Sequence, residues 1–150
     1  MPISNVITVA DDILRAAKAR GFSLTPMQLM KLTYIAHGYS LGLGHGDLFG
    51  ERIEAWKYGP VIPDLYHATK RWGRDPIPLD RIEDGRALDG HAARTIDQVL
   101  DKYGKMSGPQ LSNLTHKAGT PWSEVYREGC LNIEIKDSNI ERHYRELLGE

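Results

Sequence analysis

Side chains with hydroxyl, imidazole and carboxylate groups could do chemistry in this protein, but their spacing in the sequence does not predict an active site. Thr115 and His116 place a hydroxyl beside an imidazole, the two groups that a nucleophile and its base supply. Adjacent residues of a helix point about 100° apart and do not face each other. No acidic residue that could orient the imidazole is recognisable around them. Helix capping or a buried hydrogen bond explains the pair with fewer assumptions, and we expect no enzyme.

The histidines are also not spaced as metal ligands. No two of them have the i to i+4 separation that places two zinc ligands on one helix face. The histidines are His37, His45, His67, His91, His116 and His143. The glycine-rich run from Gly42 to Gly46 lacks the terminal Gly-Lys-Ser/Thr of a phosphate loop, and it follows an expected helix instead of a strand. We expect no metal ion and no cofactor.

The segment from Ala55 to Tyr66 is the part of the sequence that most favours recognition of a partner. Gly59 can adopt backbone angles closed to other residues and Pro60 fixes its own φ, so the Gly-Pro step predicts a rigid turn. Three large aromatic residues surround this step, namely Trp56, Tyr58 and Tyr66. Such residues are favoured both in cores and in recognition sites. Either these residues lock the turn against the core, or they contact the partner.

A basic cluster follows this turn, and the two together form the candidate partner-binding surface. The cluster could meet an acidic partner, although solvation of a helix end also explains it. The candidate residues are Trp56, Lys57, Tyr58, Pro60, Tyr66, Lys70, Arg71 and Arg74. The loop from Arg74 to Gly90, with mixed charges and two prolines, is expected to extend this surface.

The composition indicates one domain over residues 1–150. Of its residues 41% are hydrophobic, and a chain of this length buries roughly 70% of its unfolded surface. The net charge of −1 provides no overall field that would attract nucleic acid or an anionic membrane. Cys130 is the single cysteine, which excludes an internal disulfide and suits the cytoplasm. No signal peptide is recognisable and no apolar run reaches the ~20 residues of a membrane span, so we expect a cytoplasmic protein.

Helix start and stop signals predict a mainly α, compact bundle of six to seven helices. The clearest start is Thr25, where Pro26 at the first helical position and Gln28 complete a capping box. Apolar residues then cover more than one face of this second helix, so we expect it to form the centre of the core. The first helix is expected to start near Thr8, with Asp11 closing the cap. Other helices are expected to start near Pro63, Ala92, Ser107, Thr120 and Ser138, with a short extended segment around Ile53 to Lys57.

Three separated blocks of the sequence resemble the Panacea domain, the family that includes the SocA antitoxin and phage-associated GepA-type proteins. The blocks are Thr25 to Tyr39, then Ala55 to Val61 with Leu65 and Tyr66, then Leu111 to His116 with Pro121 and Trp122. They occur in the family's order, and the resemblance covers nearly the whole chain, from about Val9 to Tyr144. The motif residues that we expect to be structural are Gln28, Lys31, Leu32, Tyr34, Gly59, Leu114, Thr115, His116, Pro121 and Trp122.

The resemblance implies an antitoxin that neutralises a cognate toxin by direct protein contact. In the SocA branch it also implies an adaptor that delivers the bound toxin to a cytoplasmic ATP-dependent protease, and the motifs do not assign the branch. Because a helix is expected to run almost to Glu150, we expect a folded surface to bind the toxin, without a disordered tail. A DNA-binding regulator is the remaining interpretation, and the neutral charge and lack of a basic recognition helix disfavour it.

Overall fold

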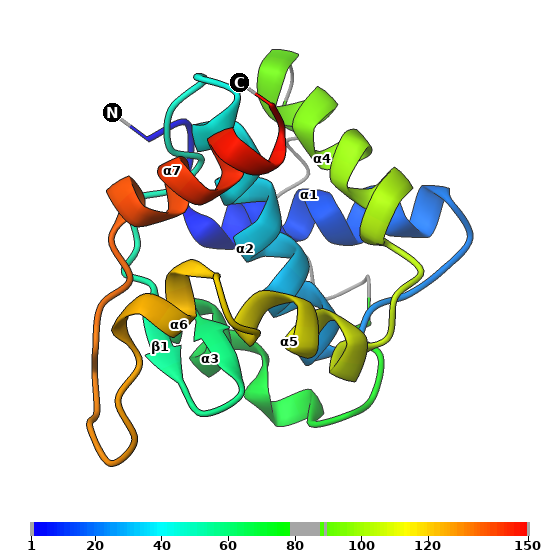
Figure 1. Cartoon of the computed structure of the whole chain (residues 1–150). Coiled ribbons are helices and arrows are strands. Elements are labelled where there is room, and N and C mark those ends of the chain that lie inside the picture. Colours follow the sequence, from blue (N-terminus) through cyan, green and yellow to red (C-terminus); the bar gives the residue numbers. More distant parts are fainter. Residues whose placement is uncertain (1, 79–87, 89, 150) are drawn as a thin grey trace.

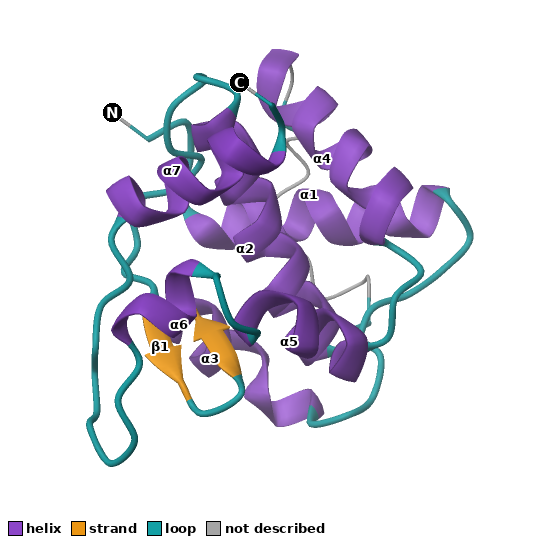
Figure 2. Ribbon diagram, viewed as in Figure 1, coloured by secondary structure: helices purple, strands orange, loops and turns teal. Residues whose placement is uncertain are grey.

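The computed structural model describes residues 2–78, 88 and 90–149, and it is mainly α-helical (Figures 1 and 2). The helices are α1 Val6–Ala19, α2 Pro26–Gly42, α3 Pro63–Thr69, α4 Gly90–Tyr103, α5 Gly108–His116, α6 Pro121–Val125 and α7 Asp137–Leu147, with a 3-10 helix, η1, at Lys70–Trp72. Within the described ranges one small sheet occurs, formed by β1 Glu54–Trp56 and β2 Gly59–Val61. The predicted fold class is therefore confirmed. None of these helices combines the length and the apolar character that crossing a bilayer requires.

The second helix, α2, lies at the centre of the fold (Figure 1). It starts as predicted, because Thr25 Oγ1 accepts a hydrogen bond from the Gln28 N–H at 3.3 Å and Gln28 Oε1 accepts one from the Thr25 N–H at 2.9 Å. Every residue from Leu29 to Gly42 is buried. The helices α1, α4, α5 and α7 all pack against it. The apolar pattern on more than one face of α2 thus predicted its central position correctly.

Two glycines of α2 allow α7 to lie directly on the central helix. Gly38 and Gly42 are four residues apart and face the same neighbour. A Cβ on Gly38 would overlap the ring of Tyr144, and a Cβ on Gly42 would lie 2.8 Å from the backbone carbonyl carbon of Tyr144. Tyr144 and Ile140 are both buried in this contact region of the core. The position of α7 therefore depends on the absence of two side chains from α2.

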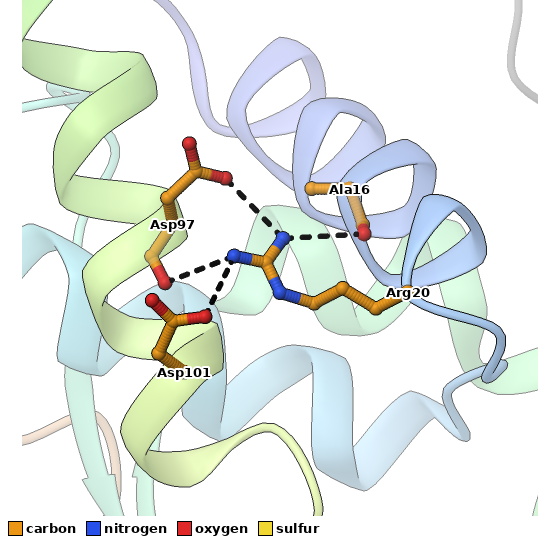
Figure 3. A network of polar contacts seen from close by, with 4 residues as sticks. All are labelled: Ala16, Arg20, Asp97 and Asp101. Atoms are coloured by element: carbon orange, nitrogen blue, oxygen red, sulfur yellow. Dashed lines mark hydrogen bonds and ion pairs between the residues drawn. The ribbon is translucent and has the colours of Figure 1, made fainter.

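Arg20, just after α1, joins this helix to α4 (Figure 3). Its Nη2 donates to a carboxylate oxygen of Asp101 at 2.9 Å, and its Nη1 donates to a carboxylate oxygen of Asp97 at 3.3 Å. The same guanidinium also donates to the backbone carbonyl oxygens of Asp97 and Ala16. One side chain therefore pairs with two carboxylates of α4 and caps a carbonyl in the last turn of α1.

The predicted start of α1 near Thr8 is wrong, and the other predicted caps are confirmed. Asn5 is the N-cap of α1, and its side-chain oxygen accepts a hydrogen bond from the Thr8 N–H at 2.9 Å. Both Asn and Thr are good N-caps, and Val6, which is fully buried, belongs to the helix. The remaining capped starts agree with the prediction: Ser107 and Gln110 form a capping box for α5, and Thr120 caps α6.

The Gly-Pro step is not a turn, which corrects the prediction. Gly59 and Pro60 lie in β2, opposite Trp56 and Ala55 of β1, and the turn of the hairpin consists of Lys57 and Tyr58. Gly59 has a φ of +120°, which favours glycine at the first position of this strand. The extended segment predicted around Ile53 to Lys57 is confirmed as β1, but its partner strand was not predicted.

Candidate functional site

A cleft of about 430 Å³ opens between the start of α2, the hairpin, and the α3–η1 segment. Most of its lining residues are apolar or aromatic, and they come from three separated parts of the sequence. They are Pro26, Met27, Met30, Lys31, Trp56, Lys57, Tyr58, Val61, Tyr66, Thr69, Lys70 and Gly73. We call this site the hairpin cleft. It has the size and the lining typical of a binding site. The two strands of the hairpin beside it are the orange arrows of Figure 2.

Three large hydrophobic side chains of the hairpin cleft are exposed to solvent. Tyr58 is 61% exposed, Met27 is 41% exposed and Tyr66 is 38% exposed. The ring of Tyr66 packs edge-on against the ring of Trp56, with 5.0 Å between the ring centroids. Exposed aromatic residues beside an apolar cleft are typical of a protein-recognition surface.

Lys31 is buried in the lining of the hairpin cleft. Its side chain comes from the apolar helix α2, and the residue is only 3% exposed. The ammonium Nζ donates a hydrogen bond to the backbone carbonyl oxygen of Pro60 at 2.9 Å. Burial lowers the pKa of Lys31 from 10.5 to about 7, because the charged form loses its hydration. The cleft thus contains an amine whose charged form is disfavoured by burial.

The cleft has a positive character. Its charged lining residues are Lys31, Lys57 and Lys70, with no Asp or Glu among the lining residues. Lys57 Nζ lies 5.5 Å from the centroid of the Tyr58 ring, and Lys70 Nζ lies 3.4 Å from Nδ1 of His67. In the described part of the chain, the ion pairs are made by arginines and by His37, so none of the three lysines has a carboxylate partner.

Residues of α5 and α6 hold the hairpin from its other side. The indole N–H of Trp122 donates to the backbone carbonyl oxygen of Trp56, and the Ser112 hydroxyl donates to the carbonyl oxygen of Tyr58 at 2.6 Å. A Cβ on Gly59 would lie 3.4 Å from Thr115 Oγ1 and 3.0 Å from Lys31 Nζ. Gly59 thus lies close to Lys31 of α2 and Thr115 of α5, and its positive φ also favours glycine at this position.

Residues 29–123 match the model of the family described as antitoxin SocA-like, Panacea domain. The chain belongs to this family. The matched span contains the hairpin, α3 and η1, together with most of α2 and the α5 helix that supports the hairpin.

A curated relative supports the same assignment for this SocA-like family member. The chain is 31% identical over 152 residues to the protein named Antitoxin SocA of Caulobacter vibrioides (strain NA1000 / CB15N). The alignment covers 91% of this chain and 80% of the relative. No solved structure matches the chain significantly. The resemblance to the Panacea domain is therefore confirmed.

In this SocA-like domain, the structure brings together five of the eight residues predicted to bind a partner. Those that line the hairpin cleft are Trp56, Lys57, Tyr58, Tyr66 and Lys70.

Three candidates lie elsewhere. Pro60 is buried, Arg71 stacks on Trp72 with 4.3 Å between its guanidinium carbon and the ring centroid, and Arg74 is exposed but does not line the cleft. Much of the loop predicted to extend the surface, namely residues 79–87 and 89, lies outside the described residues.

Several residues of the family motif are used in hydrogen bonds and packing. The Thr115 hydroxyl donates to the carbonyl oxygen of Leu111 at 2.9 Å, which is a bond within α5. His116 Nδ1 contacts the carbonyl oxygen of Ser112, and its ring packs edge-on against Trp122. The pair is thus engaged with the backbone and with a neighbouring ring. Among the described residues, no group of three or more His, Cys, Asp or Glu side chains is placed to hold a metal ion.

The contribution of α2 to the cleft was not predicted from the sequence. Met27, Met30 and Lys31 stand at positions i, i+3 and i+4, so they share one face at the start of the helix. The signal was present, because Lys31 is the only charged residue between Pro26 and Gly42. A single lysine in an otherwise uncharged central helix indicates a specific buried contact.

Proposed function

We propose that this protein is the antitoxin of a toxin–antitoxin pair, and that it neutralises a protein toxin by direct binding at the hairpin cleft. Membership of the SocA-like antitoxin family and the name of the Caulobacter relative support the antitoxin role. The proposal assigns no enzymatic activity and no cofactor to the protein. We place the activity in the cytoplasm, where an exposed free thiol such as that of Cys130 stays reduced.

The observation that carries the binding surface is the exposure of Tyr58 and Tyr66 at the edge of an apolar cleft. Tyr and Trp side chains dominate the energy of many protein interfaces, because they bury a large area while losing little conformational entropy. The hairpin is held by hydrogen bonds from Ser112 and Trp122, so its shape does not have to form on binding. A preorganised surface loses less entropy than a disordered tail when it binds.

A protease adaptor is a second candidate within the same class, and one observation favours it. An adaptor needs a second contact surface besides the one that holds the toxin. Leu131 is 85% exposed in the segment between α6 and α7, and it does not line the hairpin cleft. This interpretation expects the toxin level in cells to fall only when the protease is present, and it expects substitution of Leu131 to stop the fall without stopping toxin binding.

Co-expression with the product of the adjacent gene tests the proposed function. The wild-type protein is expected to restore growth, and a Tyr58→Ala, Tyr66→Ala variant is expected to lose both rescue and toxin binding in a pull-down. Leu147→Ala is the matched control, because Leu147 is 52% exposed on α7 and does not line the cleft. Circular dichroism must show that the wild type and both variants are folded. Full rescue by a folded double variant would contradict the binding surface, and failure of the wild type would contradict the antitoxin role.

A further inference from the structure

We propose that the hairpin cleft binds an acidic and apolar segment of the partner, and that Lys31, Lys57 and Lys70 receive its Glu or Asp carboxylates. The inference rests on the proposed function, because it describes the chemistry of the toxin segment that enters the cleft. It commits to carboxylate-bearing side chains on a protein segment, carried between apolar residues.

The charges of the cleft lining favour an acidic partner. Among the residues that the structure describes, the cleft lining holds three lysines and no acidic residue. Carboxylates form the ion pairs of the described arginines, yet no carboxylate of the described residues lies within ion-pair distance of these lysines. Positive patches select partners of the opposite charge and repel others of like charge. An acidic segment is therefore the occupant that this lining favours.

The hydrogen bonding of Lys31 also favours a carboxylate in the cleft. An ammonium group has three N–H donors, and the carbonyl oxygen of Pro60 is the acceptor for Nζ within the described residues. A buried ammonium with one neutral acceptor is unfavourable, as the lowered pKa of Lys31 reflects. A carboxylate that enters the cleft would form a charge-assisted hydrogen bond and offset this cost.

The apolar surface around the lysines favours a segment that also carries apolar residues. Met27, Tyr58 and Tyr66 are exposed beside Lys57 and Lys70. Apolar side chains of the partner can bury these surfaces, and carboxylates on the same segment reach the exposed ammonium groups. The two exposed lysines lie at the edge, where salt screens them, and the buried Lys31 is screened less.

A matched pair of blocked peptides tests the inference without the toxin. The probes are a hexapeptide of alternating Leu and Glu, acetylated and amidated, and the same peptide with Gln in place of Glu. Titration into the ¹⁵N-labelled full chain, followed by NMR, gives both the dissociation constant and the site. We expect the Glu peptide to shift signals of the hairpin cleft and to bind about tenfold more tightly than the Gln peptide, the effect of one charge-assisted hydrogen bond.

The variants assign the preference to individual lysines. The double variant Lys57→Gln, Lys70→Gln is expected to reduce both the preference for the Glu peptide and the salt dependence of that preference. Lys31→Met is expected to reduce the part of the preference that persists at high salt. Lys102→Gln is the control, because Lys102 is an exposed lysine of α4 and lies outside the cleft lining. Equal affinity for the two peptides, or binding of neither, overturns the inference. If the peptides show no preference but the Tyr58→Ala, Tyr66→Ala variant still loses rescue, the acidic-segment inference fails and the proposed function stands. The two failures are therefore distinguishable.

Discussion

Lys31 donates a hydrogen bond of 2.9 Å to the carbonyl oxygen of Pro60, and this bond connects the central helix to the second strand of the hairpin. Lys31 occupies a buried position in the core, where an ammonium group is unfavourable. The bond therefore links the energetics of the core to the position of the hairpin and of the cleft beside it.

Replacement of Lys31 by Met is expected to change how stability depends on pH. The pKa of Lys31 is about 7 in the folded protein and near 10.5 in the unfolded chain, so between these values the unfolded chain binds more protons. The free energy of unfolding of the wild type therefore rises with pH between these two pKa values. Lys31 contributes up to about 1.4 kcal/mol per pH unit to this rise. Below the lower pKa, the full cost of burying the charged lysine is present. Lys31→Met removes this dependence. Urea unfolding at several pH values measures it.

Lys102→Met is the control for this experiment, because Lys102 is exposed and its substitution leaves the buried ammonium in place. Its free energy of unfolding is expected to run parallel to that of the wild type. A Lys31→Met curve that is also parallel to the wild type between about pH 7 and pH 9 would show that Lys31 keeps its proton in the fold.

Gly38→Ala and Gly42→Ala are expected to destabilise the protein, although glycine to alanine in a helix interior normally stabilises by roughly 0.5–1 kcal/mol. The added Cβ meets the Tyr144 ring at position 38 and the backbone of α7 at position 42. Overpacking of this kind costs about 1–3 kcal/mol. The loss should be larger at Gly42, because a backbone cannot rotate away as a ring can. Thermal unfolding of both variants measures the order, and a stabilised Gly42→Ala would contradict the close contact.

Two tyrosines of α2 are expected to respond differently to replacement by Phe. Tyr34 and Tyr39 are both 1% exposed. The Tyr39 hydroxyl lies 3.0 Å from the Tyr103 hydroxyl, whereas the Tyr34 hydroxyl has no hydrogen-bond partner among the described residues. Tyr39→Phe should cost about 1 kcal/mol, and Tyr34→Phe should be neutral or stabilising. Chemical denaturation of the two variants provides the comparison, and a clear loss in Tyr34→Phe would reveal a bound water or another acceptor.

The bridge from Arg20 to α4 is expected to contribute little and to weaken with salt. The Arg20 side chain is 27% exposed, and those of Asp97 and Asp101 are 58% and 71% exposed. Partly exposed pairs contribute about 0.2–1 kcal/mol each and are screened by salt. A double-mutant cycle of Arg20→Gln with Asp101→Asn should therefore give a coupling energy in this range that falls at high salt. A coupling that is unchanged by salt would indicate a more buried pair than the structure has.

The helices were predictable because their signals are local. Thr25 with Gln28, and Ser107 with Gln110, form their capping boxes within four residues of sequence, so propensity and hydrogen bonding agree. The start of α1 was missed because Asn5 and Thr8 are both acceptable caps, and the burial of Val6 decides between them.

The hairpin cleft was only partly predictable because its contacts join distant segments. The aromatic residues of the hairpin were recognised, but the Gly-Pro step was assigned to a turn, since the pairing of Gly59 with Trp56 depends on the strand register. The part of α2 in the cleft could not be placed, because the hydrogen bond from Lys31 to Pro60 spans 29 residues. Gly38 and Gly42 likewise show their role only when α7 is in position.

The contact of α7 with Gly38 and Gly42 also determines when the core is completed during synthesis. Tyr144 and Ile140 belong to the core and come from the last helix of the described chain, so the central helix remains uncovered on one face until they leave the ribosome. A nascent chain that stops earlier exposes apolar surface that chaperones and proteases recognise. In the antitoxin role that we propose, interrupted translation would therefore leave an existing toxin unopposed.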